Sequence, residues 1–123
     1  TYRVSEHWQA GSMTRAQPWL AELVHNVFVE MSEELARKKG IRNGDKVLIT
    51  TTRGDITALA CITKRFKPLS VQGKSIEHIG VLWHFGFNGY AKGDPANRLT
   101  PHIGDGNTMI PEYKAWLCDI RRV

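Results

Sequence analysis

The chain has 123 residues, 41% of them hydrophobic and 24% charged, which suits one folded domain rather than a disordered segment. Its formal net charge of +5 favours anionic partners, but no basic stripe alternates with aromatic residues, so we expect no nucleic-acid binding. No signal peptide is visible, the apolar runs are far shorter than a bilayer requires, and the first residue is Thr1. We therefore expect no direct membrane contact and interpret the chain as a fragment of a larger subunit.

The first half of the chain predicts short strands around one small helix. Residues 1–18 show no clear period and predict the start of a strand followed by a long loop. A strand over 27–31 precedes a helix that Ser32 can cap with its hydroxyl. This helix is expected to end at Gly40, which can adopt the left-handed conformation. A strand is then expected over 46–52, followed by a turn at 53–55. A second strand, with apolar residues in alternation, is expected over 56–66.

The second half of the chain predicts loops between two further strands. Residues 68–74 are expected to form a loop, in which Gln72-Gly73 has the chemistry of a hairpin turn. A mixed strand follows over 76–85, and a final strand is expected over 115–120. Residues 87–107 are rich in Gly, Pro, Asn and Asp, and a loop of this length is more often functional than idle. This pattern of elements predicts a mainly-β barrel.

Common catalytic and metal motifs are absent or incomplete. Gly73-Lys74-Ser75 resembles the end of a phosphate-binding P-loop, but Pro68 occupies the position where that motif needs glycine. Gly86-Phe87-Asn88-Gly89 lacks the full dinucleotide fingerprint, and no nucleophile elbow is present. The five histidines lack zinc-site spacing, so we assign no metal ligand and no catalytic residue. Cys61 and Cys118 are interpreted as two buried free thiols, with a disulfide as the alternative.

The loop over residues 7–15 collects hydroxyls, an amide, a guanidinium and a glycine. Such groups, together with exposed backbone amides, suit a phosphate-rich ligand. Gly11 would let the backbone approach that ligand closely, and Trp8 and Met13 could pack on a ring system. An ordinary polar loop is the alternative that these residues leave open. The candidate binding residues of the loop are His7, Trp8, Gln9, Gly11, Ser12, Met13, Thr14 and Arg15.

Two later segments offer groups of the same kind. Residues 93–101 contain Asn97, whose amide has both donors and acceptors and suits the edge of a base or a pterin. Residues 111–114, Pro-Glu-Tyr-Lys, contain Lys114, a mobile cation that suits a phosphate or a carbonyl oxygen. Turn chemistry for Asn97 and a solvated surface for Lys114 are the alternatives.

Taken together, these segments resemble the molybdopterin-dinucleotide-binding domain that closes the large subunits of the dimethyl sulfoxide reductase superfamily. The resemblance covers nearly the whole chain and is carried by residues 7–15, 41–47, 52–54, 96–101 and 111–114. Within the superfamily, the second half of the chain is most similar to the large (alpha) subunit of respiratory formate dehydrogenase, on residues 63–66, 79–86 and 97–108.

The resemblance implies a six-stranded double-psi β-barrel with one or more short helices, as a single domain over residues 1–123. It implies a bis-(molybdopterin guanine dinucleotide) cofactor with molybdenum or tungsten, bound by the 7–15 loop and by Asn97, Tyr113 and Lys114. In relatives the metal ligand and an iron–sulfur cluster belong to earlier domains. Oxidation of formate to carbon dioxide is therefore expected of the parent enzyme, and the isolated segment is expected to be inactive.

The resemblance also implies partners, namely the remainder of the large subunit and an iron–sulfur electron-transfer subunit. It suggests a periplasmic location, with the cytoplasm as the alternative. Alternative sources of the same domain are a nitrate reductase and a small subunit like that of formylmethanofuran dehydrogenase. A non-enzymatic double-psi barrel that serves as an interaction module is the alternative from another class, and it would leave the 7–15 loop unexplained.

Overall fold

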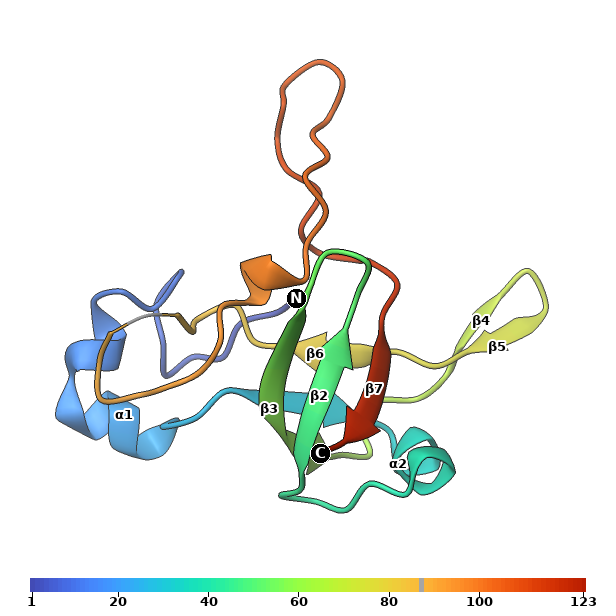
Figure 1. Cartoon of the computed structure of the whole chain (residues 1–123), viewed down its shortest axis with the longest axis horizontal. Helices are drawn as coiled ribbons and strands as arrows, with labels where there is room; N and C mark the ends of the chain where they lie inside the picture. The colour runs from blue at the N-terminus through green and yellow to red at the C-terminus, as the bar shows by residue number, and fades with distance from the viewer. Residues whose placement is uncertain (87) are drawn as a thin grey trace.

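A curled five-stranded sheet forms the centre of the computed structural model, which describes residues 1–86 and 88–123 (Figure 1). Its strand order is β6-β1-β3-β2-β7. Strands β1 and β3 are parallel, whereas every other neighbouring pair in this sheet is antiparallel. The strands are β1 (Phe28–Met31), β2 (Lys46–Thr50), β3 (Asp55–Ile62), β6 (Ile79–Val81) and β7 (Asp119–Arg122).

The N-terminal segment extends the sheet beyond β6. Tyr2 forms a parallel bridge with Leu82. The amide of Tyr2 donates to the carbonyl of Val81 at 3.0 Å, and the amide of Trp83 donates to the carbonyl of Tyr2 at 3.1 Å. The predicted mainly-β, barrel-like class is therefore confirmed. The described residues place five strands in the main sheet, and the six-stranded double-psi topology stays a prediction.

The core lies against one face of this sheet. Apolar residues alternate along β3, where Ile56, Ala58 and Ala60 are buried as the period of two predicts. Across the ladder, Ile49 of β2 pairs with Ile56 and is completely buried. In β1, Met31 is also completely buried. Removal of these side chains from water is the main stabilising contribution to the domain.

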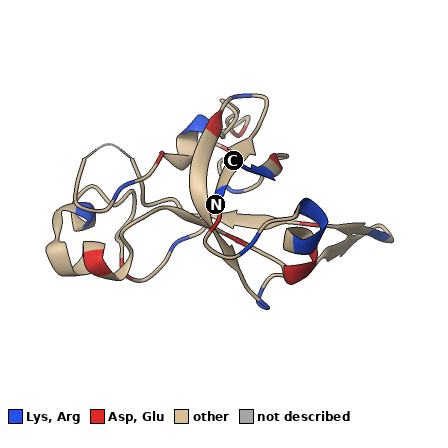
Figure 2. Ribbon diagram, turned by 60° about the horizontal axis from the view of Figure 1, so that its bottom comes forward, with Lys and Arg blue, Asp and Glu red and all other residues tan. Residues whose placement is uncertain are grey.

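Helix α2 (Glu33–Lys39) forms where the sequence predicts it. The hydroxyl of Ser32 accepts a hydrogen bond from the amide of Leu35 at 2.9 Å, and Gly40 ends the helix with φ 64°. Acidic residues occupy the first turn and basic residues the last, so both ends complement the helix dipole (Figure 2). The buried side chains of Leu35 and Ala36 supply the tertiary packing that so short a helix needs.

A second helix, α1 (Pro18–Leu23), is absent from our sequence prediction. It follows a 3₁₀ turn, η1 (Thr14–Ala16), which lies within the loop that we predict over 1–18, and it continues into residues for which we predict no element. Pro18 occupies the first turn, where its missing amide costs no hydrogen bond. Ala21 is its only buried residue, whereas Trp19 and Leu23 are exposed. The weak apolar pattern of this helix explains why periodicity does not reveal it.

Three predicted strands end at different residues in the structure. The strand expected over 46–52 is β2 and ends at Thr50. The strand expected over 56–66 is β3 and ends at Ile62, because Thr63 turns the chain by accepting a hydrogen bond from the amide of Arg65 at 3.2 Å. The final strand is β7 rather than 115–120. Its register is set by pairing with β2, which places Ile120 opposite Ile49 in the core.

The strand expected over 76–85 is shorter in the structure, where β6 occupies residues 79–81 and Ile76 belongs to a separate hairpin. Strands β4 (Leu69–Val71) and β5 (Lys74–Ile76) form a two-stranded antiparallel ladder that projects from the body (Figure 1). The predicted turn at Gln72-Gly73 is confirmed, with φ of 49° and 75°. The prediction of a loop over 68–74 is wrong on both sides of this turn, because β4 and β5 pair with each other up to Val71 and Lys74.

The long loop that we expect over 87–107 begins at Phe87, which lies outside the described residues. Its later part contains a 3₁₀ turn, η2 (Ala96–Arg98), and continues into a long projection (Figure 1). Both cysteines are free, but Cys118 is exposed and Cys61 half-buried, so the predicted burial is wrong for Cys118. Within 1–86 and 88–123, no helix has the length and apolarity to cross a bilayer.

Candidate functional site

The 7–15 loop is fastened to the interior by two of its own polar side chains. Nε2 of His7 donates to the carbonyl of Val24 at 2.8 Å, and Nδ1 lies 3.1 Å from the hydroxyl of Thr14. That hydroxyl also accepts from the amide of Trp8 at 3.2 Å. His7 is buried and its ring packs edge-on against Phe85, with centroids 5.6 Å apart. The polar atoms of His7 and Thr14 therefore hold the loop in shape.

Arg15 joins the same loop to the segment that follows β6. Its side chain is only 7% exposed. Nη1 donates to the carbonyls of Ala10 at 2.5 Å and His84 at 2.6 Å, and Nε donates to the carbonyl of Asn88 at 3.1 Å. Burial lowers the pKa of the guanidinium. Arg15 is thus a buried cation whose described hydrogen-bond partners are backbone carbonyls, and it clamps two loops together.

His84 completes this anchor from the other side. Its fully buried ring donates from Nδ1 to the carbonyl of Gln9 at 2.6 Å and accepts at Nε2 from the amide of Val4 at 2.8 Å. Burial lowers the pKa of the imidazole, so the ring is neutral with its proton on Nδ1. His84 therefore positions the backbone of Gln9.

Gly11 shows why a glycine is needed in this loop. It is buried with φ 78°, and a Cβ added there would lie 2.1 Å from the carbonyl oxygen of His84. The close backbone approach that the sequence predicts is therefore made to the protein's own backbone. Trp8, Ser12 and Met13 instead lie exposed on the outer side of the loop.

A pocket of about 580 Å³ brings together candidate residues from distant parts of the chain. Gln9 reaches it from the 7–15 loop, Asn97 from η2, and Tyr113 from the segment before β7. The 87 residues between Gln9 and Asn97 make this convergence a product of the fold rather than of local sequence. The pocket is completed by Arg3, Arg53, Trp83, Thr100, Pro101, His102 and Pro111.

The groups that line this pocket suit an anionic ligand with a ring system. Arg3 and Arg53 supply two guanidinium groups, and none of the described lining residues is a carboxylate. Trp83 and Tyr113 pack with ring centroids 5.0 Å apart and planes tilted by 33°. Arg53 and Trp83 lie in segments that carry the family resemblance, which is the signal that could have identified them. Arg3 has no comparable signal in the sequence.

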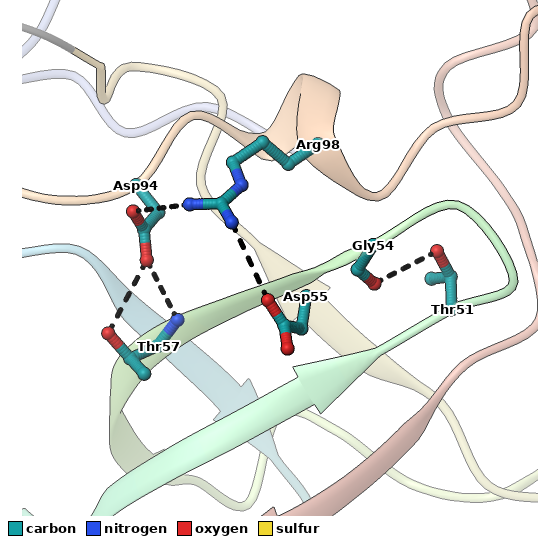
Figure 3. A network of polar contacts seen from close by, with 6 residues as sticks. All are labelled: Thr51, Gly54, Asp55, Thr57, Asp94 and Arg98. Carbon is teal, nitrogen blue, oxygen red and sulfur yellow. Dashed lines mark hydrogen bonds and ion pairs between the residues drawn. The ribbon is translucent and has the colours of Figure 1, made fainter.

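Asn97 is held in place by the residues around it rather than by its own side chain. The neighbouring Arg98 forms ion pairs with Asp94 at 3.3 Å and with Asp55 of β3 at 3.6 Å (Figure 3). Asp94 accepts hydrogen bonds from the amide of Thr57 at 3.0 Å and from its hydroxyl at 3.4 Å. These contacts, which we name the η2 latch, tie η2 to β3.

The turn between β2 and β3 reinforces this attachment. The hydroxyl of Thr51 lies 3.3 Å from the carbonyl of Gly54 (Figure 3). It also lies 3.0 Å from the carbonyl of Leu99. A Cβ on Gly54 would lie 2.8 Å from the carbonyl oxygen of Arg98. Leu99 is completely buried. The backbone on both sides of Asn97 is therefore fixed to the sheet.

Lys114 lies next to this pocket rather than among its lining residues. It lines an adjoining pocket of about 560 Å³, which shares Pro111 and Tyr113 with the first. Its carbonyl lies 2.7 Å from the main-chain nitrogen of Thr1. Within 1–86 and 88–123, no three His, Cys, Asp or Glu side chains gather as metal ligands. Direct contact of each candidate residue with a cofactor stays a prediction.

The family is decided by a match to the model of the Molydopterin dinucleotide binding domain, which covers residues 1–117. The chain belongs to this family. The match extends over both ends of the candidate pocket, from Arg3 to Tyr113, and so includes every residue that lines it.

Relatives of this dinucleotide-binding domain are formate dehydrogenase large subunits. It is 52% identical over 124 residues to the formate dehydrogenase subunit alpha of Megalodesulfovibrio gigas, with 99% of the chain covered. It is 46% identical over 123 residues to the nitrate-inducible formate dehydrogenase major subunit of Escherichia coli, again with 99% covered. Identity is 33% over the whole chain to the F420-dependent formate dehydrogenase 1 subunit alpha of Methanococcus maripaludis. The chain spans 12% of the length of the first two relatives and 16% of the third.

Proposed function

We propose that this domain binds a bis-(molybdopterin guanine dinucleotide) cofactor with molybdenum or tungsten, within the large subunit of a formate dehydrogenase. The observation that carries the proposal is the pocket that joins Gln9, Asn97 and Tyr113. The family match supports a molybdopterin dinucleotide as the ligand. The similarity to formate dehydrogenase large subunits supports the identity of the parent enzyme.

The chemistry of the pocket fits part of such a cofactor. Its volume of about 580 Å³ lies within the roughly 300–1,000 Å³ of typical ligand sites. The guanidinium groups of Arg3 and Arg53 suit phosphates, and the amides of Gln9 and Asn97 suit the polar edge of a purine or a pterin. The rings of Trp83 and Tyr113 offer apolar surface for a heterocycle, and the absence of carboxylates from the described lining avoids repulsion of phosphates.

In the proposed parent enzyme, formate is oxidised to carbon dioxide with release of one proton and two electrons. When bound, the metal–pterin group supplies the two-electron redox chemistry for this reaction. The residues of this chain bind and orient that group, and we assign none of them a catalytic role. His84 is held neutral by its two backbone partners and acts as an anchor for Gln9. We therefore predict no formate oxidation by the isolated domain.

The alternatives differ in how well the comparisons support them. A nitrate reductase or a small subunit of the formylmethanofuran dehydrogenase type would use the same family of domain. The relatives compared above, however, bear the name formate dehydrogenase and match the chain at up to 52% identity. A non-enzymatic interaction module would have no need for the two arginines and two amides of the pocket. We therefore favour the formate dehydrogenase.

Partners and location belong to the same proposal. The remainder of the large subunit, with its iron–sulfur cluster, and an electron-transfer subunit are the partners that we propose. A periplasmic location is supported by the resemblance to respiratory enzymes alone. Fractionation of cells that produce the parent enzyme distinguishes the periplasm from the cytoplasm.

The test uses the complete large subunit with an Asn97→Ala substitution. Loss of one hydrogen-bonding edge costs on the order of 1–3 kcal/mol, so cofactor should dissociate roughly 5- to 150-fold faster. Molybdenum, tungsten and acid-released guanine nucleotide are measured per polypeptide, and two guanines per metal are expected before substitution. Asn88→Ala is the matched control, because Asn88 is an exposed asparagine outside the pocket. Unchanged metal and nucleotide retention in Asn97→Ala would contradict the site.

A further inference from the structure

A long arm over residues 102–112 projects from the body of the domain (Figure 1). All of its residues except Gly104 are exposed. Its two legs form an antiparallel bridge between Gly104 and Pro111. The amide of Glu112 donates to the carbonyl of Ile103 at 2.9 Å. The arm is therefore held by its own backbone rather than by packing on the domain.

The tip of this arm has a defined shape. One carboxylate oxygen of Asp105 accepts from the amide of Asn107 at 3.1 Å and from both the amide and the hydroxyl of Thr108 at 2.9 Å. The amide of Met109 donates to the carbonyl of Asp105 at 2.8 Å. A tip organised before it meets a partner loses less conformational entropy when it binds.

Three large apolar side chains are presented by the arm. Ile103 is 58% exposed, Met109 73% and Ile110 61%. The ionised side chains of the arm are Asp105, which is occupied by its own turn, and Glu112. Permanent interfaces are more apolar than transient ones, and charge-steered encounters need complementary charges. The composition of the arm thus favours a permanent apolar contact.

The arm arises from the rim of the candidate cofactor pocket. His102 and Pro111, one on each leg, both line that pocket. At its root, the main-chain nitrogen of Thr1 lies 2.7 Å from the carbonyl of Lys114, and the hydroxyl of Thr1 donates to the carbonyl of Tyr113 at 2.9 Å. Any partner of the arm consequently lies close to the cofactor side of the domain.

We propose that the 102–112 arm inserts Ile103, Met109 and Ile110 into an apolar groove elsewhere on the same large subunit. The proposal rests on the proposed function only in taking the chain as a domain of such a subunit. The relatives leave ample chain for this groove, because the domain spans 12% of their length. The contact brings the rest of the subunit against the pocket rim and helps to retain the cofactor.

The first test places a photoreactive amino acid at position 110 of the complete subunit. Copies with light and heavy isotopes are mixed before irradiation, and cross-linked peptides are identified by mass spectrometry. Cross-links to peptides of the same isotopic type, outside residues 1–123, are expected. Mixed-isotope cross-links would indicate a second copy. Cross-links to another subunit, or none at all, would equally overturn the proposal.

The second test measures cleavage before Asp105 by an Asp-specific protease in the complete subunit. The double variant Ile103→Glu, Ile110→Glu should be cleaved at least tenfold faster than the unsubstituted subunit, because the docked arm is released. Leu23→Glu changes an exposed leucine on α1 and should leave this rate unchanged. Equal cleavage of all three proteins would contradict docking. Suppose that the purified subunit contains neither molybdenum nor tungsten, while its arm is still cleaved slowly and the double variant is cleaved faster. That result would support docking and contradict only the proposed function.

Discussion

Gly11 and Gly44 both adopt the left-handed conformation, with φ of 78° and 85°, but their surroundings differ. An added Cβ at Gly11 meets the His84 carbonyl oxygen at 2.1 Å, whereas nothing lies within 4 Å of one at Gly44. Gly44→Ala should therefore cost about 1–2 kcal/mol from backbone strain alone. Gly11→Ala adds a clash of about 1–3 kcal/mol. Urea unfolding measures the free energy of unfolding of the two variants. Equal losses in Gly11→Ala and Gly44→Ala would show that the contact between Gly11 and His84 is not made.

His84 should make the stability of the domain depend on pH. Protonation of Nε2 would set two N–H groups against each other at Val4, and burial already lowers the pKa of this ring. The unfolded chain takes up the proton near the ordinary pKa of about 6.5, before the folded chain does. The free energy of unfolding should therefore fall as pH drops below about 6.5, by up to about 1.4 kcal/mol per pH unit, until the lowered folded pKa is passed.

Urea unfolding between about pH 5 and 7.5 tests this dependence. His84→Gln keeps a donor and an acceptor but does not titrate, so this part of the slope should disappear. His25→Gln changes an exposed histidine and should preserve it. An unchanged slope in His84→Gln would assign the pH dependence to other groups.

At the scale of elements, the η2 latch should govern the placement of Asn97. Asp94→Ala removes the acceptor for the amide of Thr57 and one ion-pair partner of Arg98. We expect a stability loss of about 1–2 kcal/mol in urea unfolding. We also expect a lower metal content in the complete subunit, although Asn97 itself is retained. Asp119→Ala removes an exposed pair with Lys39 and should cost less than about 1 kcal/mol without loss of metal. Similar results for the two variants would argue against the latch.

Local signals in the sequence were sufficient for some elements and insufficient for others. Helix α2 was predictable because Ser32 and Gly40 determine its ends within a few residues. The boundaries of β7 were not, because they depend on the register with β2, some 70 positions earlier in the chain.

The same distinction applies to the candidate site. Gln9, Asn97 and Tyr113 could be selected by their chemistry and by the family resemblance, and the fold brings them to one pocket. The inward direction of Arg15 and the anchoring role of His84 depend on contacts between segments far apart in the sequence. Residue types alone contain no information on such contacts.

For the whole molecule, hydrogen exchange should separate a protected sheet from exposed projections. Amides in the ladders that join β1, β2 and β3 are expected to exchange slowest, because their residues surround the buried core. The β4–β5 hairpin and the 102–112 arm should exchange fastest in the isolated domain, since their residues are almost all exposed. Mass spectrometry of exchanged peptides measures this order. Equal protection of amides in the projections and in the sheet would contradict this prediction, because it would mean that the projections are packed against the rest of the domain.

The pairing of β2 with β7 has a consequence for synthesis of the protein on the ribosome. Strand β2 ends at Thr50 and β7 begins at Asp119, so 68 residues must be added between the two strands. At roughly 5–20 residues per second, this takes about 3–14 s. During that interval, the outer edge of β2 exposes unpaired backbone groups to other nascent chains. We therefore expect that a chaperone that shields the edge of β2 until β7 has been made would raise the yield of the folded domain.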